Sequence, residues 1–269
     1  MINVHPLYSS SSGNMFHFET PKANILIDAG VSYKAIREGL SSINKEAKDI
    51  DAVLITHEHT DHIKGIPLFC RKNPETPIYA TVKTAKYLKN LLDSQNISGN
   101  IIGFEYNTTF KINDIVVTPF ETSHDALMPC GYNLQVGDKK LSYATDLGYV
   151  SDEVFNYIKA SDYYVIESNY DKTMLEFGKY TYPVKRRIAG PTGHLSNEDA
   201  SRLIAKIYEL GQAQNRFLLA HLSENNNEPN LAMDFINSTL KQLDVDVTNI
   251  EISIASKKLS NEEYLVWLI

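Results

Sequence analysis

Residues 52–62 read AVLITHEHTDH, an apolar run followed at once by side chains that bind metals. The first four residues match a short strand that is covered on both faces. The next seven contain three histidines and one aspartate, namely His57, His59, Asp61 and His62. Imidazoles this close would repel one another if protonated, whereas the neutral ring nitrogen is a good ligand for a borderline metal such as zinc. The stretch therefore predicts a buried strand that ends in a metal-binding loop.

The spacing of these ligands favours two neighbouring metal positions. His57 and His59 can point the same way, because side chains in an extended chain repeat every two residues. Asp61 and His62 then fall on the following turn and face an adjacent position. Four ligands are too few for two metals, so others must come from distant parts of the chain. The candidates each follow an apolar, strand-like run: His124, Asp146 and His221.

Apolar patterning predicts strands and helices that alternate along the whole chain. The expected strands are rich in Val, Ile, Leu and Tyr and cover residues 24–28, 52–56, 115–120, 140–145, 163–167, 216–220 and 251–254. The expected helices cover residues 32–40, 83–93, 152–160, 197–210 and 232–243, and Ser196 with Asp199 forms a capping box before the fourth. Residues 170–188 have helical spacing that Gly178 and Pro183 interrupt.

Polar residues recur at the ends of the predicted strands. Asp28, His57, Asp146, Glu167 and His221 each lie at or just after such an end. Strand ends are rigid platforms whose loops meet at one rim, so these side chains can converge. Asp28 is expected to anchor the turn beside the metal-binding loop.

Bulk composition predicts a soluble globular protein with a single domain over residues 1–269. Hydrophobic residues make up 43% and charged residues 22%, and there is no linker that would separate domains. The net charge of −7 argues against a nucleic-acid coat protein, but an enzyme on nucleic acid can attract phosphate through metals and a local basic cluster. Cys70 and Cys130 have no metal-type spacing and are expected as buried fillers. Without a signal-peptide pattern or a bilayer-length apolar run, we expect a cytoplasmic protein with no membrane contact and no obligate protein partner.

The chain contains the motif HxHxDH, followed by a distant His, an Asp after a strand and a final His. This order and spacing resemble the metallo-β-lactamase superfamily over nearly the whole chain. The resemblance implies an α/β (α+β) fold, a four-layer αββα sandwich of two mixed sheets with helices outside. It implies one metal on His57, His59 and His124. It implies a second metal on Asp61, His62 and His221, with Asp146 bridging the two. The expected cofactors are two divalent metal ions, zinc first, with manganese or iron as alternatives.

Other positions discriminate among branches of that superfamily. Asp146 stands where β-lactamases of this fold commonly have Cys, and His59 stands where flavodiiron relatives have an acidic residue. The interval from Asp146 to His221 is too short for a large β-CASP nuclease insert. The stretches SSSSGN (9–14), ESNY (167–170), KRRI (185–188), GHLSNE (193–198) and AHLS (220–223) resemble the YycJ (WalJ) group. That group comprises cytoplasmic bacterial hydrolases with nuclease-like activity on DNA; Tyr170 stands where the group often has a His.

The predicted chemistry is hydrolysis, with Asp61, Asp146 and His194 as catalytic residues. Zinc can lower the pKa of a bound water to about 7, and Asp61 would orient that water. His194 follows Gly193 and precedes a helix N-terminus, where it either protonates the leaving group or merely stabilises the turn.

The phosphate-binding candidates are less specific. Asn169 can donate a hydrogen bond to a phosphate oxygen. Ser12, Gly13 and Asn14 form either a loop that presents backbone N–H groups or a plain hairpin turn. Arg186, within the basic run 185–187, either contacts a nucleic-acid backbone or is simply solvated.

The predicted function is a dinuclear-metal phosphodiesterase, a nuclease or exonuclease on DNA or another nucleic acid. The alternatives are a carboxyl-ester, thioester or lactone hydrolase on the same metal pair, and a non-catalytic metal-binding module.

Overall fold

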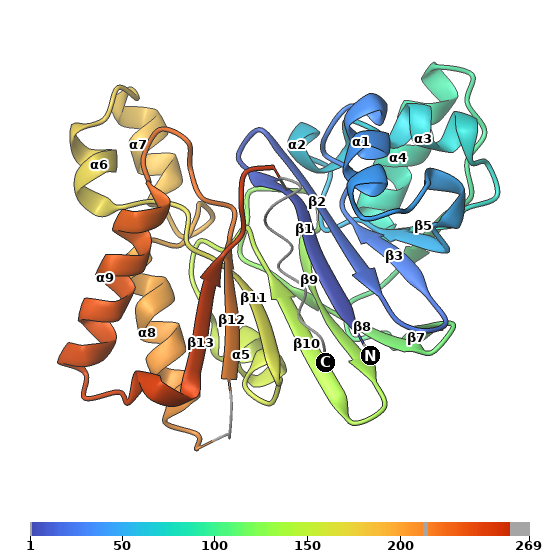
Figure 1. The fold of residues 1–269 in the computed structure, drawn as a ribbon. Coiled ribbons are helices and arrows are strands. Elements are labelled where there is room, and N and C mark those ends of the chain that lie inside the picture. The colour runs from blue at the N-terminus through green and yellow to red at the C-terminus, as the bar shows by residue number, and fades with distance from the viewer. Residues whose placement is uncertain (1, 212–214, 259–269) are drawn as a thin grey trace. The chain divides into compact units, whose positions relative to one another are not determined.

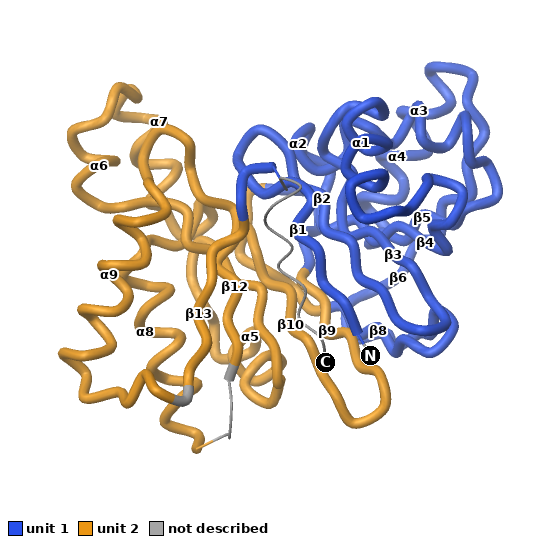
Figure 2. The backbone as a smooth tube through the Cα atoms, in the orientation of Figure 1, with its two compact units in different colours: residues 1–119, 126–130, 256–269 blue, residues 120–125, 131–255 orange. Residues whose placement is uncertain are grey.

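The computed structural model describes residues 2–211 and 215–258 (Figure 1). The chain divides into two compact units, which Figure 2 shows in separate colours. Unit 1 comprises residues 1–119, 126–130 and 256–269, and unit 2 comprises residues 120–125 and 131–255. The interpretation of residues 1–269 as one domain concerns how the units act together, and it stays a prediction.

Unit 1 is built on a six-stranded mixed sheet in the order β1-β2-β3-β4-β5-β6. The first three strands pair antiparallel, and β3 to β6 pair parallel. Their bounds are β1 Asn3–Ser10, β2 Gly13–Glu19, β3 Asn24–Ile27, β4 Ala52–Leu54, β5 Ile78–Thr81 and β6 Ile101–Phe104. The helices are α1 Tyr33–Ser42, α2 Thr60–Ile63, α3 Ile66–Lys72, α4 Val82–Ser94 and the 3₁₀ helix η1 Ala47–Asp49. The antiparallel hairpin of β7 Phe110–Ile112 and β8 Ile115–Glu121 begins in this unit.

The core of unit 1 explains why β4 can serve as a rigid platform. All three residues of β4 are fully buried. Val53 packs in one apolar cluster with Leu26 of β3, Ile78 of β5 and Leu40 of α1. A strand without an exposed face holds the backbone that follows it in a fixed position.

Unit 2 contains the strand order β13-β12-β11-β10-β9. β9 and β10 pair antiparallel, and β10 to β13 pair parallel. The bounds are β9 Cys130–Val136, β10 Lys139–Ala144, β11 Tyr163–Glu167, β12 Asn215–Ala220 and β13 Ile250–Ile254. The helices are α5 Asp152–Ile158, α6 Lys172–Phe177, α7 Tyr182–Ile188, α8 Asn197–Tyr208, α9 Pro229–Gln242 and the 3₁₀ helix η2 Val247–Asn249.

Helix α8 begins where the sequence predicts it. The Ser196 hydroxyl accepts a hydrogen bond from the Asp199 backbone N–H, and the Asp199 carboxylate accepts from Ser196, which is the expected capping box. Leu203, Ile204 and Ile207 then pack into the apolar core of unit 2 together with residues of β11 and β12. The cap and the core together fix the loop of residues 193–196 that precedes the helix.

The parallel strands place the predicted ligands at common edges. In unit 1, Asp28 directly follows β3, and His57 comes three residues after its neighbour β4. In unit 2, Glu167 ends β11 and His221 directly follows the parallel strand β12. The chain turns sharply at these points: Asp28, Asp146 and His221 have φ angles of 62°, 57° and 58°. Non-glycine residues in this left-handed region are uncommon and persist where the surroundings hold them.

The structure confirms every predicted strand and helix, with ends that agree to within three residues. The ambiguous segment 170–188 forms two helices, α6 and α7, with Gly178 as the C-cap of α6. Pro183 does not interrupt a helix, because it lies in the first turn of α7, where its missing N–H is not needed. Cys70 and Cys130 are buried thiols, as expected. Across the described ranges, we find no helix with the length and hydrophobicity needed to cross a bilayer.

Candidate metal centre

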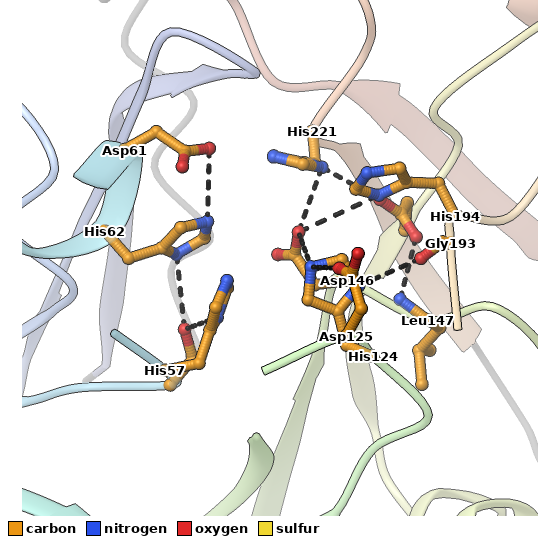
Figure 3. Close-up of polar contacts among 12 residues, drawn as sticks. His57, Asp61, His62, His124, Asp125, Asp146, Leu147, Gly193, His194 and His221 are labelled. Carbon is orange, nitrogen blue, oxygen red and sulfur yellow. Dashed lines mark hydrogen bonds and ion pairs between the residues drawn. The ribbon is translucent and has the colours of Figure 1, made fainter. Parts of the chain in front are cut away.

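In unit 1, the HxHxDH segment begins in the loop after β4, which carries His57 and His59, and continues into helix α2, which carries Asp61 and His62. Figure 3 shows His57, Asp61 and His62. The rings of His57 and His59 lie 4.5 Å apart between centroids, and those of His57 and His62 lie 4.0 Å apart. The Asp61 carboxylate lies 3.4 Å from Nε2 of His62. The structure therefore brings together the four ligands that the sequence predicts in this unit.

Asp28 orients the buried ring of His62. Nδ1 of His62 lies 2.7 Å from one Asp28 oxygen, and the Thr56 backbone N–H donates to the other at 2.9 Å. The Thr56 hydroxyl also contacts Asp28 and lies 3.1 Å from Nδ1 of His57. Burial raises the pKa of Asp28, and the charge and hydrogen bond of His62 offset only part of that rise. Asp28 thus ties the end of β3 to two predicted ligands, which confirms its expected anchoring role.

Gly30 permits the close approach of this loop. A Cβ atom at Gly30 would lie 1.5 Å from the carbonyl oxygen of Asp61, where no side chain fits. The Ala29 backbone N–H also donates to the carbonyl of His62 at 2.8 Å. The Asp-Ala-Gly turn and the ligand loop are therefore packed backbone against backbone, which limits the movement of Asp61 and His62.

In unit 2, a second cluster contains Asp146, Glu167, His194 and His221, whose ligand atoms lie within 4.8 Å of one another. Oδ1 of Asp146 lies 3.7 Å from Nδ1 of His221 and 3.8 Å from Nδ1 of His194. Nε2 of His124 approaches the same oxygen at 3.7 Å (Figure 3). The three predicted ligands of this unit, His124, Asp146 and His221, therefore lie together, with His194 beside them.

Glu167 is the buried acceptor on which the second cluster depends. Its Oε1 lies 2.8 Å from Nδ1 of His194 and 2.8 Å from Nδ1 of His221. Its Oε2 accepts from the backbone N–H groups of Leu147 and Leu195. Burial alone would raise the pKa of Glu167, but the charges and hydrogen bonds of the two histidines outweigh it and hold that pKa well below its usual range. We assign Glu167 a positioning role, because both of its oxygens already accept hydrogen bonds.

His124 is oriented by the loop that carries His194. Nδ1 of His124 donates to the backbone carbonyl of Gly193 at 3.0 Å. Burial lowers the pKa of His124, which favours the neutral ring that a metal requires. The ring centroids of His124 and His194 lie 5.1 Å apart.

The chemistry of these donors fits a divalent metal. Nδ1 is engaged by Asp28 in His62, by a carbonyl in His124 and by Glu167 in His221. A hydrogen bond at Nδ1 fixes the tautomer and makes Nε2 the ligand atom, and we assign the tautomers from these acceptors. Rings oriented in this way, together with aspartates, suit zinc, manganese or iron.

The structure shows where each predicted phosphate-binding residue lies. Ser10 pairs with Gly13, so residues 11–12 form a plain hairpin turn between β1 and β2, and Gly13 and Asn14 belong to β2. The Asn14 side-chain amide lies 3.3 Å from Nε2 of His62. The Asn169 amide donates to the backbone carbonyl of His221 at 2.8 Å. Arg186 lies on the exposed helix α7. Substrate contacts of Ser12, Gly13, Asn14, Asn169 and Arg186 stay predictions.

From the sequence, Asp28 was predicted to have only a structural role, and no role was predicted for Glu167. The signal that identifies both is an acidic residue at or directly after the end of a buried strand. Such a carboxylate is costly to bury unless hydrogen-bond donors surround it, and histidine Nδ1–H groups are suitable donors.

Comparisons with known proteins agree with the geometry. A family model described as "Beta-lactamase superfamily domain" matches residues 23–222. The chain is 40% identical to exodeoxyribonuclease WalJ of Streptococcus pneumoniae over 247 residues, which is 90% of this chain and 89% of the relative. It is 36% identical to exodeoxyribonuclease YycJ of Bacillus anthracis over 88% of both chains.

Solved structures show the same fold at low sequence identity. The metallo-β-lactamase fold protein YhfI of Bacillus subtilis matches with a TM-score of 0.71 and 17% identity, over 96% of this chain and 97% of that one. Zn(2+)-bound PqqB of Methylobacterium extorquens matches with a TM-score of 0.70 and 18% identity, over 97% and 100%. The two mixed sheets with their helices are therefore those of the metallo-β-lactamase fold. The chain belongs to the metallo-β-lactamase superfamily. Because it is 36–40% identical to WalJ and YycJ over nearly its whole length, it belongs to the YycJ/WalJ group of that superfamily.

Proposed function

We propose that this protein is a metal-dependent phosphodiesterase that degrades DNA as an exonuclease. The observation that carries the proposal is the 40% identity to exodeoxyribonuclease WalJ over 90% of the chain. The oriented histidines of both clusters support it, because a hydrolase of this superfamily needs its ligands held in place. A cytoplasmic site of action fits a DNA substrate and belongs to the same proposal.

The proposed ligand assignment uses both units. His57, His59 and His124 would hold one divalent metal. Asp61, His62 and His221 would hold a second. Asp146, whose carboxylate has two oxygens, would be a ligand shared by both sites. The support comes from the ligand order of the superfamily and from the separate geometry of each cluster, in which Nδ1 of His62, His124 and His221 already has an acceptor. Zinc is the proposed metal because imidazole dominates the donor set.

The residues around the metals have distinct proposed roles. Divalent metals supply Lewis acidity and lower the pKa of coordinated water when bound. Asp61 orients the attacking water through its second oxygen. His194 donates a proton to the leaving oxygen from Nε2, since its Nδ1 is bound to Glu167. The His194 side chain is 16% exposed, whereas those of His124, Asp146 and His221 are at most 4% exposed, so a substrate can reach it.

The test combines metal analysis with a substrate panel on one purified sample. We expect bound divalent metal, turnover of a chromogenic phosphodiester, and shortening of DNA from an end. Asp146→Ala should abolish turnover and remove at least one metal, whereas His194→Ala should keep the metals and turn over slowly. Loss of metal from His194→Ala would contradict its proposed role. If a fully metal-loaded sample hydrolyses thioesters or lactones but no phosphodiester, the protein is an ester hydrolase and not a nuclease.

A further inference from the structure

Helices α6 and α7, which Figure 1 labels, carry exposed aromatic and basic side chains. Tyr182 is 72% exposed and Phe177 is 80% exposed. None of the seven residues of α7 is buried. Large aromatic side chains in water are unfavourable unless they serve a contact, and here they lie on adjoining elements.

This surface does not depend on its aromatic residues for its shape. The Gly178 backbone joins the two helices, and the Lys185 ammonium donates to the carbonyl of Glu176 at 2.7 Å. At the other end of α7, the carbonyl of Ile188 accepts from the backbone N–H of His194 at 2.9 Å. A Cβ at Gly193 would lie 2.1 Å from that carbonyl oxygen, so the loop closes tightly on the helix. Polar and backbone contacts therefore hold α7, and the exposed rings are available for binding.

The surface is basic on an acidic protein. Residues 170–190 contain five basic and two acidic side chains, whereas the whole chain has a net charge of −7. Two of the basic residues have internal partners, since Lys172 pairs with Glu198 and Arg187 pairs with Asp125. Arg186 instead lies over the ring of Tyr182, 5.9 Å from its centroid. Arg186 is thus the cation that lies over the Tyr182 ring, and the ammonium of the neighbouring Lys185 rests on the carbonyl of Glu176.

The two helices also border a hollow of about 670 Å³. Its lining combines the aromatic rings of Tyr170 and Tyr182 with the basic residues Lys185 and Arg186. It also includes Lys172, which pairs with Glu198, the exposed Glu176, and Asp199, whose carboxylate accepts from the Ser196 hydroxyl. A hollow of this size is in the range of pockets that hold small organic groups, and a nucleobase with its sugar is such a group. The aromatic wall suits a flat base, and the side of the hollow that carries Lys185 and Arg186 suits the phosphate linked to it.

The hollow adjoins the second cluster within unit 2. Tyr170, which lines the hollow, follows Asn169 and forms a β-bridge with Ser196. Asn169 in turn donates to the carbonyl of His221, and its backbone N–H donates to the carbonyl of Leu195. The residues that line the hollow are therefore continuous in the chain with those that position His194 and His221.

We propose that the hollow and the face of α7 bind the unpaired end of a DNA strand. A base stacks on Tyr182, and the adjoining phosphates contact Lys185 and Arg186. Single-stranded nucleic acid is bound in this manner, by aromatic stacking together with basic side chains that follow the backbone. A base inside a duplex offers no free face for stacking, so paired DNA should bind more weakly. This inference rests on the proposed nuclease function and names the form of DNA that the site takes.

The test measures binding apart from turnover, with fluorescent phosphorothioate oligonucleotides that resist cleavage. We expect the wild-type protein to bind a 12-nucleotide single strand more tightly than a blunt duplex of the same sequence. Tyr182→Ala should weaken single-strand binding about tenfold, and Tyr182→Phe, which keeps the ring, should restore it. Arg186→Gln should reduce the slope of log Kd against log salt by about 0.7, whereas Tyr182→Ala should leave that slope unchanged.

Two exposed residues on helices of unit 1 provide matched controls. Tyr87 is 42% exposed on α4, and the Lys34 side chain is 87% exposed on α1. Tyr87→Ala and Lys34→Gln should bind the single strand as the wild type does. Thermal unfolding and metal content, measured for every variant, identify any protein that has lost its fold.

The outcomes separate this inference from the proposed function. Equal binding of single strand and duplex, or folded Tyr182→Ala that binds like the wild type, would overturn the inference even if the protein degrades DNA. Failure to degrade any DNA, combined with Tyr182-dependent binding of the single strand, would instead overturn the proposed function. Equal losses of single-strand affinity in Tyr182→Ala and Tyr87→Ala would also contradict the inference, because the effect would not be specific to the surface of α6 and α7.

Discussion

The Glu167 side chain illustrates how one buried carboxylate can position several functional groups. Its two oxygens accept from His194, His221, Leu147 and Leu195, which come from three separate loops. An ionised carboxylate is retained in a fully buried place only with such a set of donors. The geometry of the second cluster therefore depends on the charge and shape of one residue that does not itself need to bind a metal.

Glu167→Gln should lower metal affinity about 10- to 100-fold, because an amide presents an N–H where the histidines require an acceptor. A competitive titration with a chromogenic chelator measures this affinity. Glu176→Gln, an exposed glutamate on α6, is the matched control and should leave the affinity unchanged. Equal affinities for Glu167→Gln and the wild-type protein would show that Glu167 does not position the ligands.

A pair of buried histidines outside the metal clusters should make the free energy of unfolding depend on pH. His5 and His17 face each other on β1 and β2, with ring centroids 5.5 Å apart. Burial, followed by the charge of His5, lowers the pKa of His17 to about 3, while Glu19 opposes this shift and Lys45 adds to it. The unfolded chain, in which the pKa is near 6.5, therefore binds the proton first. The full stability is present above pH 6.5 and declines as the pH falls from 6.5 towards 3.

Replacement of His17 by Gln should flatten this pH dependence. One proton taken up by the unfolded chain alone contributes a slope of up to about 1.4 kcal/mol per pH unit below pH 6. Urea unfolding of both proteins at pH 7, 6 and 5 measures the slope. Parallel curves for the wild-type protein and His17→Gln would mean that His17 titrates normally in the folded state.

At the scale of elements, the parallel strands and the start of α8 determine where the ligands lie. The ends of β11 and β12 place Glu167 and His221 side by side, and the Ser196 cap holds the loop that carries His194. Three links connect this loop to the cluster, namely the contacts of Gly193 with His124, of His194 with Glu167 and of Leu195 with Glu167.

Ser196→Ala should lower the free energy of unfolding by about 1 kcal/mol, because the first turn of α8 loses its side-chain acceptor. Ser196→Thr keeps the hydroxyl and should lose less. Chemical denaturation measures both values. A loss for Ser196→Ala that is no larger than for Ser196→Thr would mean that the cap does not stabilise the helix.

Sequence patterning predicted seven of the strands and five of the helices, but it missed others, and β1 and β2 show why. These strands are almost wholly buried, yet they carry His5, Ser9, Ser10, Asn14 and His17, and Pro6 lies next to a register shift. Buried polar residues remove the apolar signal on which strand prediction depends. The HxHxDH motif was identified because its residues are local, and Asp28 was placed beside it. The role of Glu167 as acceptor for His194 and His221 is recognised only once β11 and β12 are paired.

At the scale of the whole molecule, the proposed metals draw ligands from both units. Metals bound in this way stabilise the folded chain by mass action, by about 2.7 kcal/mol at a free-metal concentration 100 times the Kd. Chelation should therefore lower the unfolding temperature. His59→Ala in unit 1 and His221→Ala in unit 2 should each reduce this metal-dependent shift, because each removes a ligand of one proposed metal, and calorimetry with and without metal measures the reduction. A shift that survives intact in either variant would place the metal in one unit alone.

Anomalous diffraction from metal-loaded crystals tests the central claim most directly. We predict two peaks in the anomalous map, one within ligand distance of His57, His59 and His124 and one within ligand distance of Asp61, His62 and His221. Asp146 should contact both. A metal-loaded crystal with a peak at neither group of residues, or with these side chains in separate places, would contradict the account.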